Sequence, residues 1–128
     1  MTGYLTDTNI LIYYVNGEGS AVTRKRIEGI IHHSFIISVI SQMEFLGFRG
    51  YSDADFKLAK NFIQNASVYN ISPEIVEKTI EIRRKYSIKL PDAIIAATAL
   101  CHDLVLITHN RSDFDAISNI SIIDPCNE

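Results

Sequence analysis

Four carboxylate residues stand beside strongly apolar stretches of the chain, although they are far apart in the sequence. They are Asp7, Glu44, Asp92 and Asp113. Carboxylates are costly to bury and usually lie in solvent-facing segments, so acids next to predicted core segments are unusual. If folding brings the four together, they form a negative pocket that a hard divalent cation would neutralise.

Each acid also has an ordinary structural explanation. Asp7 can cap a helix that begins near Asn9, and Asp113 fits the turn-forming segment HNRSD. Asp92 in a first helical turn is favoured by the helix dipole. Glu44 shares a helical face with apolar residues, and its alternative is a position at the edge of that face with its carboxylate in water. The joint placement of the acids therefore carries more weight than any single one.

Apolar β-like runs alternate with amphipathic segments along the whole chain. The predicted strands are 4–6, 35–38, 67–70, 104–108 and 121–123. The predicted helices are 9–15, 21–32, a segment from Ser38 or Ser41 to 48, 53–64, 73–86, 91–102 and 112–117. This alternation predicts an α/β fold with a mostly parallel sheet, which binds ligands at the carboxyl ends of its strands. Three of the four acids fall at that edge, as strand-to-helix junctions or helix starts.

Bulk composition predicts one globular domain spanning residues 1–128. Hydrophobic residues make up 47% of the chain and charged residues 21%, which are ordinary globular values. No apolar run approaches the ~18 residues of a membrane span, and the N-terminus lacks a basic leader, so cytoplasmic residence is expected. Cys101 and Cys126 have no metal-ligand spacing and are interpreted as a core thiol and a tail thiol in a reducing compartment.

The charge balance argues against a general nucleic-acid-binding protein. The formal net charge is −3, whereas such proteins are usually basic. A local basic rim and a bound metal can still reverse the field around a cleft. Candidates for the rim are Arg24, Lys25, Arg26, Arg49, Arg83, Arg84 and Lys85, each of which has a solvated helix face or surface position as its alternative.

No histidine pair has metal-ligand spacing, and His109 is interpreted as a loop residue. Acidic oxygen ligands without a His/Cys cluster fit Mg²⁺ or Mn²⁺ better than zinc.

Four motifs resemble the PIN-domain ribonucleases, especially the small VapC-type toxins of toxin–antitoxin pairs. They are LTDTNILIYY, SVISQMEFLG, KLPDAIIAATAL and LVLITHNRSDF, in that order over essentially the whole chain. The LPDAIIAATAL segment is the most specific of them. The resemblance implies a three-layer α/β/α sandwich around a mostly parallel sheet of four or five strands. It also implies a Mg²⁺- or Mn²⁺-dependent endoribonuclease, acting on structured RNA such as tRNA, with an antitoxin partner and a homodimeric state.

The resemblance assigns roles to residues of this chain. Catalytic and metal-binding roles fall to Asp7, Glu44, Asp92 and Asp113, and orienting roles to Thr8, Asn9, Thr108 and Asn110. RNA contacts are predicted for Arg24, Arg49 and Arg83 from their positive charge and position, and not from the resemblance. The fourth acidic position departs from the family pattern, because Asn110 stands where many members have Asp. Two alternatives follow. Asp113 supplies the missing negative charge, or the fourth metal ligand is weaker and a second metal site is weaker with it.

Other functions remain open at this point. A PIN nuclease acting on DNA or in RNA maturation has the same motifs, and the Asn110 substitution favours a degenerate binding module. A phosphatase or receiver domain is a further alternative, but a receiver needs paired acids in its first loop and a late Lys, which DTN and THN do not supply. Several apolar residues serve either the core or a dimer or antitoxin surface: Leu11, Ile12, Tyr13, Tyr14, Phe45 and Phe48.

Overall fold

A five-stranded parallel sheet forms the centre of the molecule. The computed structural model describes residues 2–126. The strands are β1 (Tyr4–Thr6), β2 (Ile36–Ser38), β3 (Ser67–Tyr69), β4 (Val105–Ile107) and β5 (Ile122–Ile123). They are arranged in the order β3-β2-β1-β4-β5, and every neighbouring pair is parallel. The predicted α/β fold with its mostly parallel sheet is therefore confirmed.

Six α-helices connect the strands. They are α1 (Thr8–Val15), α2 (Ala21–His33), α3 (Val39–Leu46), α4 (Asp53–Ile63), α5 (Pro73–Lys85) and α6 (Leu90–Cys101). Serine caps set several helix starts, since the side chains of Ser20, Ser52 and Ser72 each accept a bond from a backbone N–H three residues later. Of the two starts left open for α3, Ser38 is the cap.

One predicted helix is wrong. Residues 112–117 were expected to be helical, but the structure has only the short 3₁₀ turn η1 (Arg111–Asp113) there. A six-residue segment is too short to stabilise an α-helix by itself. Instead Phe114 and Ile117 are buried in the core, so tertiary packing determines the local backbone.

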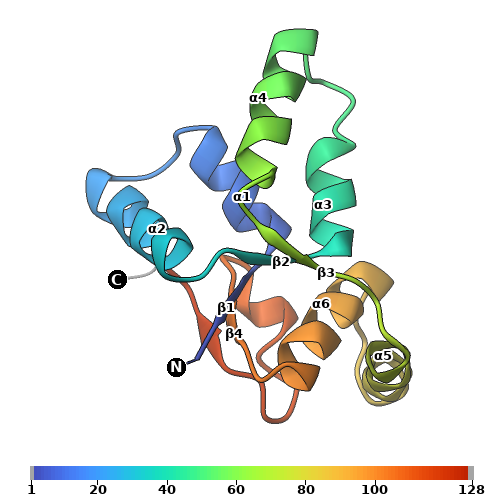
Figure 1. Ribbon diagram of the computed structural model, residues 1–128. Helices are drawn as coiled ribbons and strands as arrows, with labels where there is room; N and C mark the ends of the chain where they lie inside the picture. Colours follow the sequence, from blue (N-terminus) through green and yellow to red (C-terminus); the bar gives the residue numbers. More distant parts are fainter. Residues whose placement is uncertain (1, 127–128) are drawn as a thin grey trace.

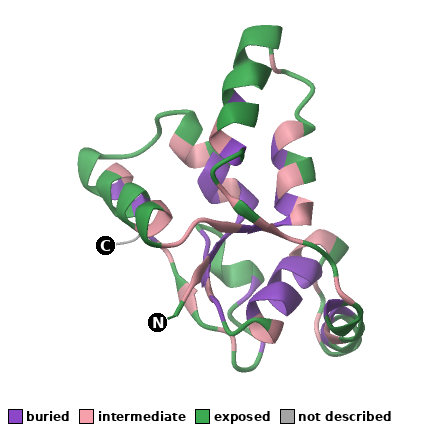
Figure 2. Ribbon diagram, in the orientation of Figure 1, coloured by how far each residue is buried: buried purple, intermediate pink, exposed green. Residues whose placement is uncertain are grey.

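Helices cover both faces of the sheet and complete three layers (Figure 1). Side chains alternate between the faces along each strand. Leu5 and Leu106, which are register partners, pack with the residues of α5 and α6. Ile107 packs on the opposite face with Ile10 of α1 and Ile27 of α2. Helix α6 is buried continuously from Ala93 to Ala99 (Figure 2). The helix that carries Asp92 in its first turn is therefore anchored in the core.

The order of connections reverses between β1 and β4. Strand β1 leads to β2 on one side, whereas β4 and β5 lie on the other side. Parallel α/β sheets bind ligands in the crevice at such a switch point. The backbone N–H of Asp7, directly after β1, donates to the Ile107 carbonyl at 2.9 Å. Segments that follow β1 and β4 are thereby brought together at the carboxyl edge.

Candidate active site

Asp7 lies buried at this switch point and is fixed by three donors. It is the N-cap of α1, and its Oδ1 accepts the Thr8 backbone N–H at 2.8 Å. Its Oδ2 accepts the Thr108 hydroxyl at 2.8 Å and the Asn9 side-chain amide at 3.2 Å. The capping role and an inward-facing carboxylate therefore coexist in one residue. Neither ion pair found within residues 2–126 involves Asp7.

The electrostatic environment links the four acids. The pKa of Asp7 is raised from 3.8 to about 6, mainly by burial. The charges of Asp92 and Glu44 contribute to this rise, and the hydrogen bonds from Thr108 and Thr8 oppose it. Burial also raises the pKa of Asp92, followed by the charges of Asp113 and Glu44. Within residues 2–126, no three of these carboxylates bring oxygen atoms within 4.8 Å of one another.

Glu44 projects from α3 and is tied to α1. Its Oε1 accepts the Thr8 hydroxyl at 2.7 Å, and this hydroxyl lies 2.9 Å from that of Ser41. Glu44 is exposed overall, as its edge position allowed, but this bond turns the carboxylate toward Asp7. Thr8 was expected to orient water or phosphate. In the structure its hydroxyl is engaged in positioning Glu44, and this contact joins residues of α1 and α3 that are 36 positions apart in sequence.

Asn9 and Thr108 connect the ends of β1 and β4. The Asn9 amide donates to Asp7 and to the Thr108 hydroxyl, and its Oδ1 accepts the His109 backbone N–H at 3.2 Å. Thr108 is fully buried and its hydroxyl also accepts the Asn110 backbone N–H at 3.1 Å. These two predicted orienting residues therefore hold Asp7 in place.

Asp113 and Asn110 occupy different positions relative to the acids. Asp113 ends η1 in an exposed position, and its charge acts on Asp92. The Asn110 side chain makes no hydrogen bond to any of the acids within the described part of the chain. Asp113 therefore lies close enough to Asp92 for its charge to raise the pKa of that carboxyl.

A cavity of about 560 Å³ adjoins two of the acids, Asp92 and Asp113, between α5, α6 and η1. Its lining consists of Arg83, Tyr86, Ser87, Ile88, Lys89, Asp92, Ser112, Asp113, Ala116 and Ile117. Arg83 was predicted to contact RNA, whereas Lys89 was missed. Lys89 could have been found from its position in the KLPD motif, three residues before Asp92. Burial and the charges of Asp113 and Glu44 raise the pKa of Asp92, and the charge of Lys89 partly opposes that rise.

The other two predicted RNA contacts lie elsewhere. The Arg24 guanidinium donates to the Tyr14 carbonyl and lies 4.8 Å from the centre of the Tyr14 ring. Arg49 is exposed after α3, and neither residue lines the cavity beside Asp92. Of the three arginines, only Arg83 is brought to the acids.

Comparison with known proteins identifies the fold and its family. The profile of the PIN domain matches residues 4–120. The chain belongs to the PIN-domain family. A toxin–antitoxin complex from Klebsiella pneumoniae is 33% identical, with a TM-score of 0.77 over 96% of this chain and 98% of that chain. DNA-bound VapBC from Salmonella typhimurium is 25% identical, with a TM-score of 0.83 over 98% of this PIN domain and 100% of that chain.

More distant likeness supports the fold alone. VapBC-1 from nontypeable Haemophilus influenzae is 23% identical, with a TM-score of 0.77 over 95% of this chain and 97% of that chain. No curated protein matches the sequence. The resemblance to VapC-type PIN proteins predicted from the four motifs is confirmed, and with it the membership of a nuclease family. No helix within residues 2–126 has the length and apolar character needed to span a membrane.

Proposed function

We propose that this PIN domain is a Mg²⁺- or Mn²⁺-dependent endoribonuclease and the toxin of a toxin–antitoxin pair. The observation that carries the proposal is a buried carboxylate, Asp7, at the switch point of the sheet, which has like-charged neighbours and no ion-pair partner among residues 2–126. Such a group is destabilising in the metal-free protein. A role in binding a cation explains why a protein keeps such a carboxylate despite its cost in stability.

The donors fit a hard divalent cation. Asp7, Glu44 and Asp92 would hold it, with Asp113 as a further acid, and all four offer carboxylate oxygens. When bound there, the ion lowers the pKa of a water molecule and offsets the charge that develops on the scissile phosphate.

The protein supplies position and a local positive charge. Thr8 holds Glu44, while Thr108 and Asn9 hold Asp7, so both carboxylates are oriented before substrate arrives. Preorganised groups of this kind need no rearrangement at the moment of reaction. Arg83 and Lys89, on the wall of the cavity beside Asp92, are placed to bind phosphates of the RNA.

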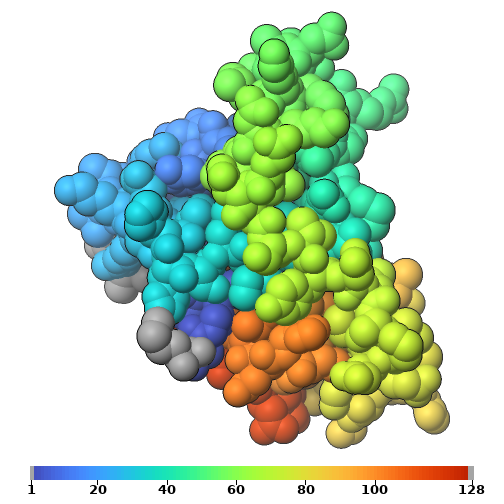
Figure 3. All heavy atoms as spheres, in the orientation of Figure 1, coloured from blue at the N-terminus to red at the C-terminus, as the bar shows by residue number. Residues whose placement is uncertain are grey.

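An apolar surface supports the proposal of a protein partner. It consists of the exposed side chains Ile12, Val15, Met43, Phe48 and Leu58 of α1, α3, α4 and the α3–α4 connection. The α3–α4 region projects from the body of the molecule (Figure 3). A hollow of about 310 Å³ there is lined partly by Val15, Phe48 and Leu58. Apolar patches of this kind mark interaction sites, and we assign this one to an antitoxin or to a second copy.

The proposal is tested by offering the purified protein RNA and DNA of the same sequence, with EDTA, Mg²⁺ or Mn²⁺. We expect cleavage of RNA with either metal, leaving 5′-phosphate and 3′-hydroxyl ends, and none in EDTA. Full activity in EDTA would contradict the metal requirement. Cleavage restricted to DNA would favour the DNA-directed alternative, and no cleavage of either would favour the non-catalytic binding module.

The cavity residues give a separate prediction. Lys89→Ala and Arg83→Ala should each raise KM for RNA about 3- to 10-fold with a smaller effect on kcat, because each removes a phosphate contact. The dependence of log(kcat/KM) on log salt should become shallower by roughly 0.7 per lost contact with single-stranded RNA. Lys57→Ala, at an exposed position of α4 that lies outside the cavity lining, is the matched control. An equal effect of all three changes would show that the lysine and arginine of the cavity act only through the overall charge of the protein, and not by direct contact with RNA.

A further inference from the structure

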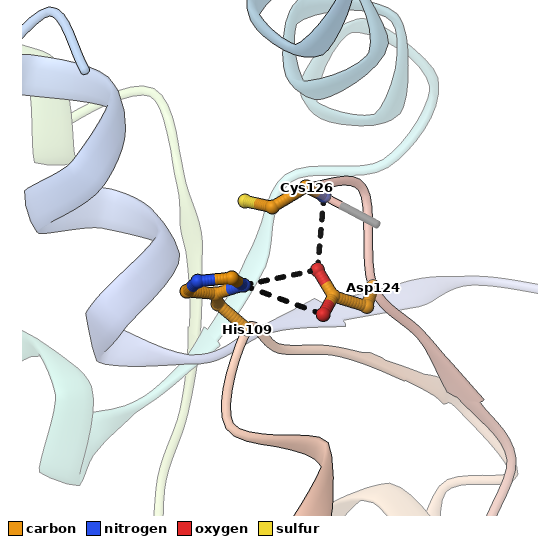
Figure 4. Close-up of side chains that lie close together, drawn as sticks. All are labelled: His109, Asp124 and Cys126. Atoms are coloured by element: carbon orange, nitrogen blue, oxygen red, sulfur yellow. Dashed lines mark hydrogen bonds and ion pairs between the residues drawn. The ribbon is translucent and has the colours of Figure 1, made fainter. Parts of the chain in front are cut away.

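A second group of metal-binding side chains lies at the carboxyl ends of β4 and β5. It consists of His109, Asp124 and Cys126 (Figure 4). Strands β4 and β5 are paired in register through Ile107 and Ile123, so the segments that follow them run side by side. His109 Nδ1 lies 3.3 Å from both carboxylate oxygens of Asp124. One ligand atom from each of the three residues lies within 4.8 Å of the others.

This donor set differs from that of the acidic site. An imidazole nitrogen, a carboxylate oxygen and a thiolate sulfur suit Zn²⁺, whereas Mg²⁺ and Mn²⁺ prefer oxygen ligands. Two N or O ligands at about 2.0–2.1 Å from a tetrahedral ion lie about 3.3 Å apart. The separation of His109 Nδ1 and the Asp124 oxygens already has this value, and the Cys126 sulfur lies within 4.8 Å of a ligand atom of each. Figure 4 shows the thiol and the carboxylate beside the same imidazole.

Surrounding groups hold the three residues in place. The Cys126 backbone N–H donates to Asp124 Oδ1 at 2.9 Å, and the preceding Pro125 is buried. The Tyr13 ring lies 5.8 Å from the His109 ring. Burial is the main cause that raises the pKa of the Cys126 thiol. The metal-free thiol is therefore protonated at neutral pH.

We propose that His109, Asp124 and Cys126 bind one zinc ion, with water in the fourth position. On binding, the thiol loses its proton to solvent and the sulfur coordinates the ion as a thiolate. The site fastens the segment after β5 to the loop after β4. Asp124 and Cys126 lie outside the residues matched by the family profile, so the site does not follow from PIN membership. It also changes the interpretation of Cys126 as an isolated tail thiol and of His109 as an ordinary loop residue.

Cobalt is the probe for this site, because Co²⁺ replaces Zn²⁺ and its bond to a thiolate gives a charge-transfer absorption in the near ultraviolet. The full chain is stripped with a chelator, reduced and titrated with Co²⁺. We expect the band to saturate at one equivalent and to disappear when Zn²⁺ is added. Cys126→Ser should abolish the band, whereas Cys101→Ser, the matched control on α6, should retain it. Zinc should raise the Tm of the wild type and of Cys101→Ser by several degrees more than that of Cys126→Ser, which keeps only the acidic site.

Further variants separate this site from the acidic one. Asp92→Asn should keep the cobalt band, because that residue belongs to the nuclease site. His109→Gln and Asp124→Asn should each weaken Co²⁺ binding by at least about tenfold, and they repeat the test if Cys126→Ser does not fold. Absence of the band in the wild type would overturn the proposal. Persistence of the band in Cys126→Ser, or its loss in Cys101→Ser, would do the same. None of these outcomes depends on RNA cleavage.

Discussion

Replacing Asp7 with Asn should abolish RNA cleavage and, in metal-free buffer, make the folded protein more stable. The amide keeps the size of the carboxylate but carries no charge and binds divalent cations poorly. Loss of a residue that only supports a metal ligand typically costs 10- to 100-fold, so loss of a direct ligand should cost more than about 100-fold in kcat/KM. Stability should change in the opposite direction, because the buried charge and its repulsion by Asp92 and Glu44 disappear.

The pH dependence of this gain has a definite sign. The folded Asp7 carboxyl binds its proton more tightly than the unfolded one, with a pKa of about 6 instead of 3.8. The cost of ionising it is therefore absent below pH 3.8, grows between 3.8 and about 6, and is complete above that range. Its full size is about 3 kcal/mol, reduced by any bond that Asn makes less well with Thr108 or Asn9. A net gain of roughly 1–3 kcal/mol at pH 8 is expected.

Denaturant unfolding in EDTA at pH 4 and pH 8 measures this effect. The free energy of unfolding of Asp7→Asn should exceed that of the wild type at pH 8, and the difference should nearly vanish at pH 4. Adding Mn²⁺ at pH 8 should stabilise the wild type more than the variant. A variant that is less stable at pH 8, or one that still cleaves RNA, would contradict the assigned role of Asp7.

Asp92→Asn should also reduce cleavage by more than about 100-fold, whereas Asp103→Asn should leave it unchanged. The two residues lie at opposite ends of α6, so each change removes one negative charge beside the same helix. Asp103 is exposed and has a left-handed backbone with φ of 52°, which Asn adopts readily. Asp92, by contrast, lines the cavity and faces the charges of Asp113 and Glu44.

Both variants are measured in the same Mn²⁺-dependent cleavage assay, with circular dichroism as the control for folding. Equal loss of activity in both would indicate that α6 responds to any loss of charge. Full activity of a folded Asp92→Asn would remove Asp92 from the site.

The sequence predicted the sheet and the location of the acids well, because both follow from local pattern. Short β-branched runs such as Ile36–Ser38 leave little choice of element, and parallel topology places the residues after β1 and β4 together. Asp7 and Asp92 were found because each carboxylate adjoins a strongly apolar segment. A carboxylate beside an apolar segment can be recognised from the sequence alone, before the fold is known.

The rest depended on contacts between distant segments. The bond from Thr8 to Glu44 joins residues 36 positions apart, and the bond from Thr108 to Asp7 joins residues 101 positions apart. Neither has a signature in local spacing. The group of His109, Asp124 and Cys126 was missed for the same reason, since strand pairing and not a ligand motif brings these residues together. Residues 112–117 were assigned as helix from propensity, which the burial of Phe114 overrides.

Anomalous diffraction from crystals soaked in Mn²⁺ tests the central claim most directly, because it locates the ion without reference to activity. The account predicts a manganese peak between Asp7, Glu44 and Asp92 in the wild type and its loss in crystals of Asp92→Asn. A peak confined to His109, Asp124 and Cys126, or no peak among the carboxylates at saturating Mn²⁺, would contradict it.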